Sequence, residues 1–488
     1  MPSTETVPAS VPQENEHYGR IVWSFAWPVV LLNSFQVVNN LLDRFFIGHL
    51  SGSALLAQSA SMTITFLLFS LAMALATGPG AIVSRAFGAG NRAEFQEAAR
   101  QSVSLSLVLG ILIALVGVGL APILGALVIP ASEPEARRLM IQYVGIFCAG
   151  LPAIYVIQAL AASMRGVGDS RSPMWISGMQ IALHIFLNFI LIFPPRAVQF
   201  GGASFTLPGF NLGLAGAATA LSASAIISAI IYLAYSARTP LGACWKMGFP
   251  TKAWAARILR IATPSAFQNV LRVMSLVAFM AILAGVPHGA AAVAALGVAF
   301  AVESIMFMPA FGLAFAASAL VGQSLGMKRP DRAERIAWLA SHYGALVILI
   351  TVVPIFFGAH KIASTMISTE TTKVVRAATA APDPRIEQKR QAVDEAASLI
   401  RWLCLTEVMF AYAMILVGAL QGAGDTVRPL WLTVVSLWVM RVPLAFLFAK
   451  VFAWGATGAW AAMSLTQAMQ GLFAILAFKQ GHWKTAKV

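Results

Sequence analysis

Three acidic residues stand inside long apolar stretches of this chain, where an ionisable group is unfavourable and is therefore a functional candidate by default. They are Asp43, Glu303 and Glu407, while the other acids fall in tails and loops. A carboxylate at membrane depth can bind a cation on one side and release it on the other, provided that burial disfavours its charged form. The residue types thus indicate ion coupling.

Asp43 is the strongest of these candidates. Asn39 lies one turn before it on the same helix face, and Gln36 adds a further polar side chain. Pro28 removes a backbone hydrogen bond earlier in the same helix and provides a hinge. A helix that carries both a hinge and a titratable group can couple protonation to movement. The alternative is that Asp43 caps the outer helix end or pairs with Arg44, although adjacent residues do not share a helix face.

Glu303 falls near the middle of a later apolar stretch, where it would attract a cationic substrate or take up a second proton. The alternative is a buried ion pair with Arg272 or Arg441. Glu407 lies near the outer end of its helix, and we expect it to face water near a cavity mouth or to lie at a surface or an interface. No metal site is expected, because the three cysteines show no metal-ligand spacing.

Long apolar segments must position these side chains. The chain is 59% hydrophobic and only 11% charged, whereas a soluble domain carries roughly 25% charged residues. A spanning helix needs roughly 20 apolar residues. The sequence therefore predicts an all-α integral membrane protein with twelve transmembrane helices. Their predicted spans are 21–48, 55–79, 100–128, 138–163, 173–195, 212–237, 257–286, 291–322, 336–360, 398–420, 429–452 and 456–479.

An internal repeat divides these helices into two halves. The stretch 166–175 (GVGDSRSPMW) returns as 422–431 (GAGDTVRPLW), and 81–94 (AIVSRAFGAGNRAE) returns as 319–332 (ALVGQSLGMKRPDR). Such repeats are typical of transporters built from two bundles. We therefore expect two six-helix bundles. The predicted parts are a cytoplasmic tail 1–19, a first bundle 20–238, a cytoplasmic linker 239–256, a second bundle 257–480 with an extracytoplasmic insertion 369–397, and a cytoplasmic tail 481–488.

Basic residues orient the chain. The formal net charge is +14, and the Lys and Arg residues concentrate in the loops on the side of the two termini. The positive-inside rule then places both termini in the cytoplasm of a multi-pass protein of the cytoplasmic (inner) membrane. Because the basic residues are explained in this way, no nucleic-acid partner is expected. We interpret the segment 369–397 as a solvated spacer or lid of mixed charge, and a short helix is predicted within it from Pro384 to Ala397.

The sequence contains no motif that indicates an enzyme instead of a transporter. The sequence has no phosphate-binding G-x-x-x-x-G-K-[ST] stretch, so no ATP site is expected. The paired Gly-x-Gly-Asp stretches occur in intramembrane proteases, but here each follows a helix and precedes Arg and Pro. Asp169 and Asp425 are therefore interpreted as caps of the next helix. We expect a protein that is not an enzyme and has no cofactor other than a coupling proton or sodium ion.

Four stretches together resemble the multidrug and toxic compound extrusion (MATE) transporters. They are 27–59, 80–92, 301–337 and the paired loops that begin at Gly166 and Gly422. The resemblance implies two six-helix bundles related by an axis along the membrane normal, with a central cavity that opens alternately to each side. It also implies export of organic cations and other amphipathic compounds, driven by proton or sodium influx.

The resemblance also suggests how the ion sites are completed. In the family, polar residues of the fifth helix complete the first-bundle site. Here Asn188 stands where many members carry aspartate, and His184 stands where they carry asparagine. His184 can titrate near neutral pH, or it can be a hydrogen-bonded core histidine. With one carboxylate in this bundle, we favour protons over sodium, which prefers several hard oxygen ligands. Some members share Glu303, whereas others carry an acid on the seventh helix where Arg272 stands.

The predicted function is a cation-coupled, proton-driven antiporter that exports small amphipathic, cationic compounds by alternating access. Soft and aromatic side chains suit such compounds, although at helical spacing they also pack in cores or face lipid. The alternatives are a sodium-coupled version and a flippase of a lipid-linked oligosaccharide or related lipid. We expect a monomer whose partners are a small organic substrate and membrane lipid. The predicted substrate-binding residues are Phe35, Gln36, Met280, Glu303, Met306 and Phe311, with Phe307, Met308 and Trp438 as further lining candidates.

Overall fold

The computed structural model describes residues 17–200, 203–246, 248–369, 384–486 and 488. Within this part of the chain, 12 helices are long and apolar enough to cross a membrane. This confirms the predicted number of spans. The predicted tail 1–19 and insertion 369–397 lie partly outside the described residues.

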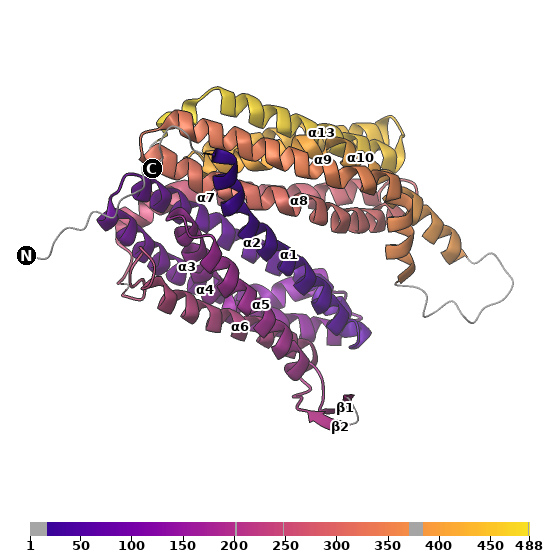
Figure 1. Cartoon of the computed structure of the whole chain (residues 1–488). Coiled ribbons are helices and arrows are strands. Elements are labelled where there is room, and N and C mark those ends of the chain that lie inside the picture. The colour runs from indigo at the N-terminus through magenta and orange to yellow at the C-terminus, as the bar shows by residue number, and fades with distance from the viewer. Residues whose placement is uncertain (1–16, 201–202, 247, 370–383, 487) are drawn as a thin grey trace, which may run out of the picture.

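The elements follow one another in an order that repeats six spans twice (Figure 1). Their bounds are α1 Tyr18–Ile47, α2 Gly52–Gly88, α3 Arg92–Val128, α4 Pro134–Gly166, α5 Arg171–Leu191, β1 Arg196–Phe200, β2 Ala203–Leu207, α6 Gly213–Ser236, α7 Lys252–Ala284, α8 Gly289–Gly326, α9 Pro330–Thr369, α10 Pro384–Gly422, α11 Val427–Thr433, the π-helical η2 Val434–Arg441, α12 Val442–Phe446, the π-helical η3 Leu447–Val451, α13 Gly455–Lys479 and the short 3-10 helix η4 His482–Thr485.

Polar residues begin several helices by accepting hydrogen bonds from free backbone amides. Ser51 accepts from the amide of Ala54 at 3.2 Å, and Asn91 accepts from that of Glu94 at 3.2 Å. Asp169 accepts from the amide of Ser172 at 2.9 Å. Its counterpart Asp425 accepts from the amide of Arg428 and pairs with its guanidinium. Both Gly-x-Gly-Asp aspartates therefore cap helices, as predicted.

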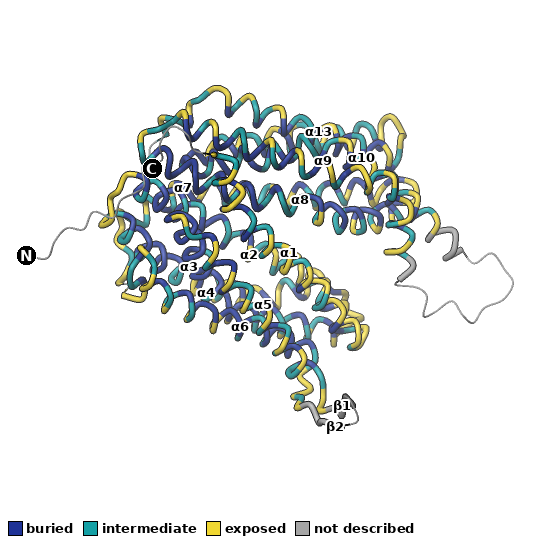
Figure 2. Tube along the Cα trace, in the orientation of Figure 1, coloured by how far each residue is buried: buried dark blue, intermediate teal, exposed yellow. Residues whose placement is uncertain are grey.

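Two separate hydrophobic cores hold the helices together. One core joins buried residues of α2 to α6, and the other joins residues of α8, α9, α10 and α13. Figure 1 shows the two helical groups close together where the chain termini lie and diverging toward the end that carries β1 and β2. Figure 2 shows buried residues concentrated between the helices of each group. Exposed residues lie along the C-terminal half of α1, which is its outer half, away from the chain termini.

The helices α1 and α7 belong to both cores. Near its start, α1 contributes Val22 and Phe25 to the core of the second bundle, whereas Phe46 at its end packs in the first. In the same way, α7 packs Ile258 in the first core and Phe279 in the second. Each half of the repeat thus begins with a helix that crosses to the other half. These two helices are placed to transmit a change in one bundle to the other.

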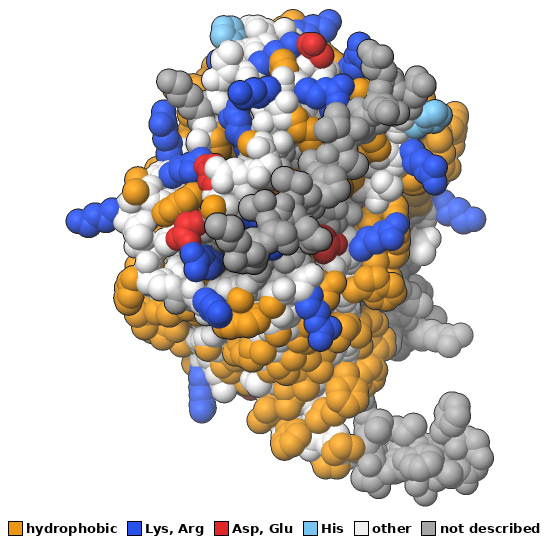
Figure 3. Space-filling view, turned by 60° about the vertical axis from the view of Figure 1, so that its left-hand side comes forward, with side chains coloured by type: hydrophobic (Ala, Val, Ile, Leu, Met, Phe, Trp, Pro, Cys, Tyr) orange, Lys and Arg blue, Asp and Glu red, His pale blue; other side chains and the backbone are white. Residues whose placement is uncertain are grey.

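The bundles make their closest contacts at the end that carries the termini. A Cβ atom on Gly88 of α2 would meet the carbonyl oxygen of Gln323 of α8 at 2.0 Å. Gln323 also donates a 2.9 Å hydrogen bond to the carbonyl of Gly166 on α4. Arg85 Nη1 donates to the carbonyl of Ala486 at 2.6 Å, which ties the C-terminal segment to the first bundle. Lys and Arg side chains gather on this face, next to a broad hydrophobic surface (Figure 3).

Three local features differ from the sequence-based expectation. The antiparallel pair β1 and β2, joined in register Arg196 to Leu207, was not predicted, because it lies in what we expected to be a plain loop. The predicted short helix that begins at Pro384 does begin there, but it continues without interruption as α10 to Gly422. The eleventh span is not a uniform α-helix, since η2 and η3 interrupt it.

Candidate ion-coupling and substrate site

A closed set of hydrogen bonds joins α1 to α5 around Asp43. Asn188 Nδ2 donates to Asp43 Oδ1 at 2.8 Å, and Asn39 Nδ2 lies 3.5 Å from Asp43 Oδ2. His184 Nδ1 lies 3.0 Å from Asn39 Oδ1, and its Nε2 lies 3.3 Å from Asn188 Nδ2. The structure thus brings together all four of the residues that we predicted for the first-bundle site.

Burial makes this cluster sensitive to charge. Asn39 and His184 are each 3% exposed and Asn188 is fully buried, whereas the side chain of Asp43 is 24% exposed. Asp43 is therefore the member of the cluster that a proton from water reaches first. Burial of the other three leaves few water molecules to compete for its hydrogen bonds.

The contacts define how protons are distributed in the cluster. Asn39 Oδ1 can only accept, so His184 must donate to it from Nδ1, which leaves Nε2 to accept from Asn188. The Nε2 atom is also 3.8 Å from Asp43 Oδ1. Asn188 Oδ1 is buried and has no hydrogen-bond partner among the described residues. The cluster therefore offers one carboxylate and one imidazole nitrogen between which a proton can be shared.

Arg44 does not share this cluster. Its Nη2 atom contacts the sulfur of Met62 on α2 at 3.8 Å, while Asp43 bonds to the two asparagines. Asp43 also lies within the helix, four residues before its last residue Ile47. The alternatives of an Asp43–Arg44 pair and of a simple cap at the helix end are therefore not what the structure shows.

Glu303 forms a second buried polar cluster, in the other bundle. It is 8% exposed and accepts a 2.8 Å hydrogen bond from Gln467 Nε2 of α13. Arg272 and Arg441 interact with it electrostatically. Arg441 Nε in turn donates to Thr466 Oγ1 at 2.9 Å. Both arginines of the predicted ion pair are thus electrostatic neighbours of Glu303, but among the described residues its direct partner is Gln467, which was not anticipated.

Glu407 contradicts its predicted placement. It is fully buried, so it does not face water near a cavity mouth. It interacts electrostatically with Glu303, and neither of its carboxylate oxygens has a hydrogen-bond partner among the described residues. An ionised carboxylate without any donor is strongly unfavourable, so the geometry requires Glu407 to be neutral. The apolar sequence around Glu407 correctly predicted that it lies in a spanning helix. It did not indicate whether the side chain points into the protein or toward water.

Comparisons with known proteins identify the family of this arrangement. The MatE family model matches residues 28–190 and 264–447, which together make up more than half of the chain. The chain belongs to the MATE family. Its members are membrane transporters and not enzymes, as the sequence predicted.

Individual relatives cover nearly the whole chain. A protein of Thermotoga maritima named probable multidrug resistance protein NorM is 27% identical over 470 residues, which cover 95% of this chain and 92% of the relative. A transporter of the MOP superfamily from Pyrococcus furiosus superposes with a TM-score of 0.82 at 20% identity, with 95% of each chain covered. A multidrug resistance MATE transporter in an outward-facing conformation gives a TM-score of 0.81 at 21% identity and the same coverage. At these identities the two structures support the fold.

The substrate-binding candidates of this MATE protein differ in exposure. On α1, Phe35 is 43% exposed, and Gln36 is exposed and donates to Asn40 at 3.4 Å. Phe311 is partly buried, with its ring centroid 4.9 Å from that of Phe315. Met280 is partly buried against the second core.

Met306 belongs to that core itself and is 1% exposed. It therefore does not line an open surface in this structure, contrary to the role that we predicted for it. Pro28, the predicted hinge, is buried within α1 between the part that packs on the second bundle and the part that packs on the first.

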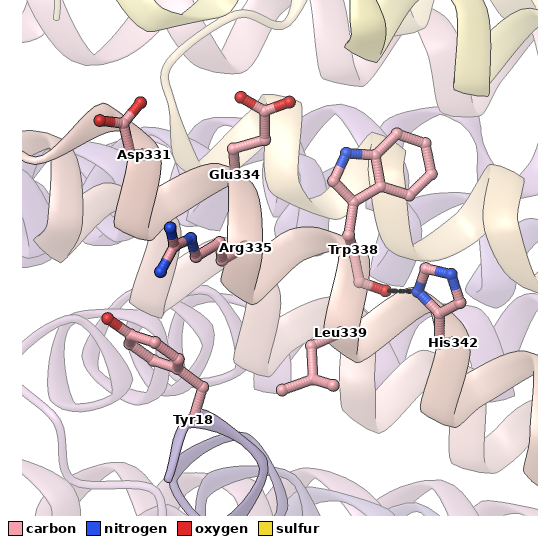
Figure 4. Close-up of a pocket in the computed structure, with 7 residues that line it drawn as sticks. All are labelled: Tyr18, Asp331, Glu334, Arg335, Trp338, Leu339 and His342. Carbon is pink, nitrogen blue, oxygen red and sulfur yellow. Dashed lines mark hydrogen bonds between the residues drawn. The ribbon is translucent and has the colours of Figure 1, made fainter. Parts of the chain in front are cut away.

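A pocket of about 600 Å³ lies elsewhere, between the start of α1 and the start of α9. Figure 4 shows Tyr18 on one side and Asp331, Glu334, Arg335 and Trp338 of α9 on the other. Tyr18 and Asp43 are 25 positions apart, which is about 37 Å along a helix. This pocket is therefore not part of the Asp43 cluster, and it opens near the end that carries the termini.

Proposed function

We propose that this MATE transporter exports small amphipathic, cationic organic compounds in exchange for protons that bind at Asp43. The observation that carries the proposal is the Asp43–Asn188–His184–Asn39 cluster, which joins a helix shared by both bundles to α5. The relatives named as multidrug resistance proteins support multidrug efflux as the class of transport.

The oxygen atoms of the cluster favour protons over sodium. Asp43 supplies two oxygens, and Asn188 Oδ1 has no hydrogen-bond partner among the described residues, but Asn39 Oδ1 already accepts from His184. Sodium, like other hard cations, is best held by several oxygen ligands. A proton needs only the carboxylate, and the nearby imidazole nitrogen provides a second position for it. The cluster is therefore better suited to a proton.

Protonation would loosen the outer half of α1 from the first bundle. The charged carboxylate is a stronger acceptor than the neutral acid, so the bond from Asn188 weakens when Asp43 is neutralised. The start of α1 remains packed on the second bundle, and Pro28 provides the flexible point between the two parts. Movement of the outer half then changes the shape of the space between the bundles, where the substrate binds.

The loop charges support an orientation with both termini in the cytoplasm of the cytoplasmic membrane. In that orientation, the contacts of Gly88, Gln323 and Arg85 close the cytoplasmic end. The structure is then an outward-facing state, ready to release substrate and take up a proton. We propose that a single chain carries out this cycle, since both bundles and both polar clusters lie within it.

Transport in everted membrane vesicles tests the function. Efflux of a fluorescent organic cation is measured under an imposed proton gradient and, separately, under an imposed sodium gradient, against vesicles without the protein. The proposal predicts transport under the proton gradient alone. Transport under sodium alone would replace the proton with sodium, and no transport under either would remove organic cation export and leave the lipid flippase to be tested.

A further inference from the structure

The pocket between α1 and α9 lies where the sequence of α9 changes from charged to apolar. Residues 330–335 (PDRAER) carry four charged side chains, whereas residues 336–360 contain no Asp, Glu, Lys or Arg. Trp338 and Tyr18 line the pocket at this boundary, and these residue types are enriched where a membrane meets water. The pocket is therefore at the level of lipid headgroups, and not in the middle of the membrane.

The pocket contains one unpaired charge of each sign. Asp331 and Arg335 are exposed, and neither forms an ion pair or a side-chain hydrogen bond with a described residue. Glu334 differs, because its Oε2 atom lies 2.6 Å from Lys484 Nζ. Asp331 and Arg335 are four residues apart, so they lie one turn from each other on the same face of α9. The pocket thus offers a free anion next to a free cation.

The same face of α9 continues beyond the pocket as an exposed apolar stripe. From His342, steps of three or four residues lead along the helix to apolar side chains that are between 50% and 80% exposed, namely Leu346, Leu349, Val353 and Phe357. Exposed apolar side chains on a helix of membrane-spanning length indicate contact with lipid tails. The charged pocket and the apolar stripe therefore follow one another in the order of the headgroup and the tails of a lipid.

We propose that this pocket binds a phospholipid whose headgroup carries a primary ammonium group. Arg335 binds the phosphate, since a guanidinium donates two parallel hydrogen bonds to phosphate oxygens, and Asp331 accepts from the ammonium. Figure 4 shows the guanidinium of Arg335 on the side of α9 where Tyr18 lies. The volume of about 600 Å³ is in the range of sites that hold small molecules.

The pair of free charges selects among headgroups. A headgroup with a phosphate and no amine would satisfy Arg335 but would place its negative charge next to Asp331, which repels it. A quaternary ammonium is positively charged but has no N–H group to donate to the carboxylate. A primary ammonium supplies both the charge and the hydrogen bonds, so phosphatidylethanolamine should bind more tightly than phosphatidylglycerol or phosphatidylcholine.

Native mass spectrometry of the purified transporter tests this site. The protein is freed of co-purified lipid by detergent exchange and titrated with the three phospholipids, which carry identical acyl chains. We expect the wild type to prefer phosphatidylethanolamine. Arg335→Gln should weaken binding of all three lipids by about tenfold, because each of them carries the phosphate. Asp331→Asn should instead lower the affinity for phosphatidylethanolamine to that for phosphatidylglycerol.

Arg171→Gln, which removes an exposed arginine from the start of α5, is the matched control and should change none of these affinities. Equal binding of the three lipids by the wild type, or unchanged binding in Arg335→Gln, would overturn the proposal. Displacement of the lipid by an equal concentration of glycerophosphoethanolamine would also overturn it, because the ligand would then be a soluble phosphate ester. The measurement uses neither an ion gradient nor a transported compound, so its result is independent of the proposed function.

Discussion

Asn188 on α5 donates a 2.8 Å hydrogen bond to Asp43 on α1, and this bond ties the outer half of a helix shared by both bundles to the first bundle. The donor is neutral and fully buried, so it stabilises the charged carboxylate without adding a charge of its own. The bond therefore holds the Asp43 carboxylate in place without a second charged group.

Replacing Asn188 should alter the pH dependence of export. A hydrogen bond that a carboxylate accepts favours its ionised form, so Asn188→Ala favours the protonated form of Asp43. We therefore expect the pH midpoint of transport to move to a more alkaline value. The measurement is the initial rate of dye efflux in vesicles across a pH series. Asn40→Ala, which removes an exposed amide of α1, should leave the midpoint in place, and an unchanged midpoint in Asn188→Ala would contradict the assigned bond.

Glu303 and Glu407 should differ in their tolerance of an apolar substitution. Glu303→Leu leaves Gln467 without its acceptor and two arginines without their counter-charge, a loss of about 3 kcal/mol. Glu407→Leu removes a group that has no hydrogen-bond partner in the described part of the chain, so it should be neutral or stabilising. Thermal unfolding in detergent measures both variants. Equal destabilisation by the two would show that Glu407 is hydrogen-bonded in solution.

The closed end should open when one glycine is enlarged. A Cβ atom on Gly326 of α8 would lie 2.1 Å from the carbonyl oxygen of Arg85 on α2. This distance is a steric clash, so one of the two helices must move. Gly326→Ala should therefore separate the bundles at that end. A single cysteine placed there reports the change as faster labelling by a thiol reagent that does not cross membranes.

Gly297→Ala on the same helix is the matched control for that experiment, because a Cβ atom there would meet no described atom within 4 Å apart from the nearby backbone of its own helix. It should leave the labelling rate at the wild-type value. Unchanged labelling in Gly326→Ala would mean that the two helices are further apart than the structure places them.

The C-terminal segment should contribute stability mainly through one ring. Trp483 is fully buried, stacks on Phe478 with ring centroids 4.6 Å apart and donates a 2.9 Å hydrogen bond to its carbonyl. Trp483→Ala should lower the free energy of unfolding by about 3 kcal/mol. Lys484→Ala removes a partly exposed ion pair with Glu334, which is worth about 0–1 kcal/mol, and a long contact of 5.9 Å between Nζ and the Trp483 ring centroid. A larger effect of Lys484→Ala would reverse the ranking.

The sequence predicted the spans and the α1 part of the first-bundle cluster because both follow from local rules. Apolar length defines a span, and a four-residue spacing brings Asn39 next to Asp43. The partners on α5, His184 and Asn188, came from the resemblance to a family and not from periodicity. The placement of Glu407 was wrong because its helix is apolar on several faces, so no polar stripe showed which way the side chain points.

Other features depend on contacts that no single helix encodes. Gln467 lies 164 positions from Glu303, and Thr466 lies 25 positions from Arg441 on the next span, so both pairings follow from the packing of α13 in the second core. The crossing of α1 and α7 between bundles likewise leaves no periodic mark in the sequence. Both features arise at the tertiary level, where distant residues become neighbours.

Proton release on substrate binding tests the role of Asp43 most directly. The purified transporter in a weakly buffered detergent solution with a pH-sensitive dye receives a saturating organic cation, and the released protons are counted for the wild type and for Asp43→Asn. The account predicts release of about one proton per bound substrate from the wild type and none from Asp43→Asn, which should still bind the cation. Equal release from the two proteins would contradict it, because the exchanged proton would then be held elsewhere.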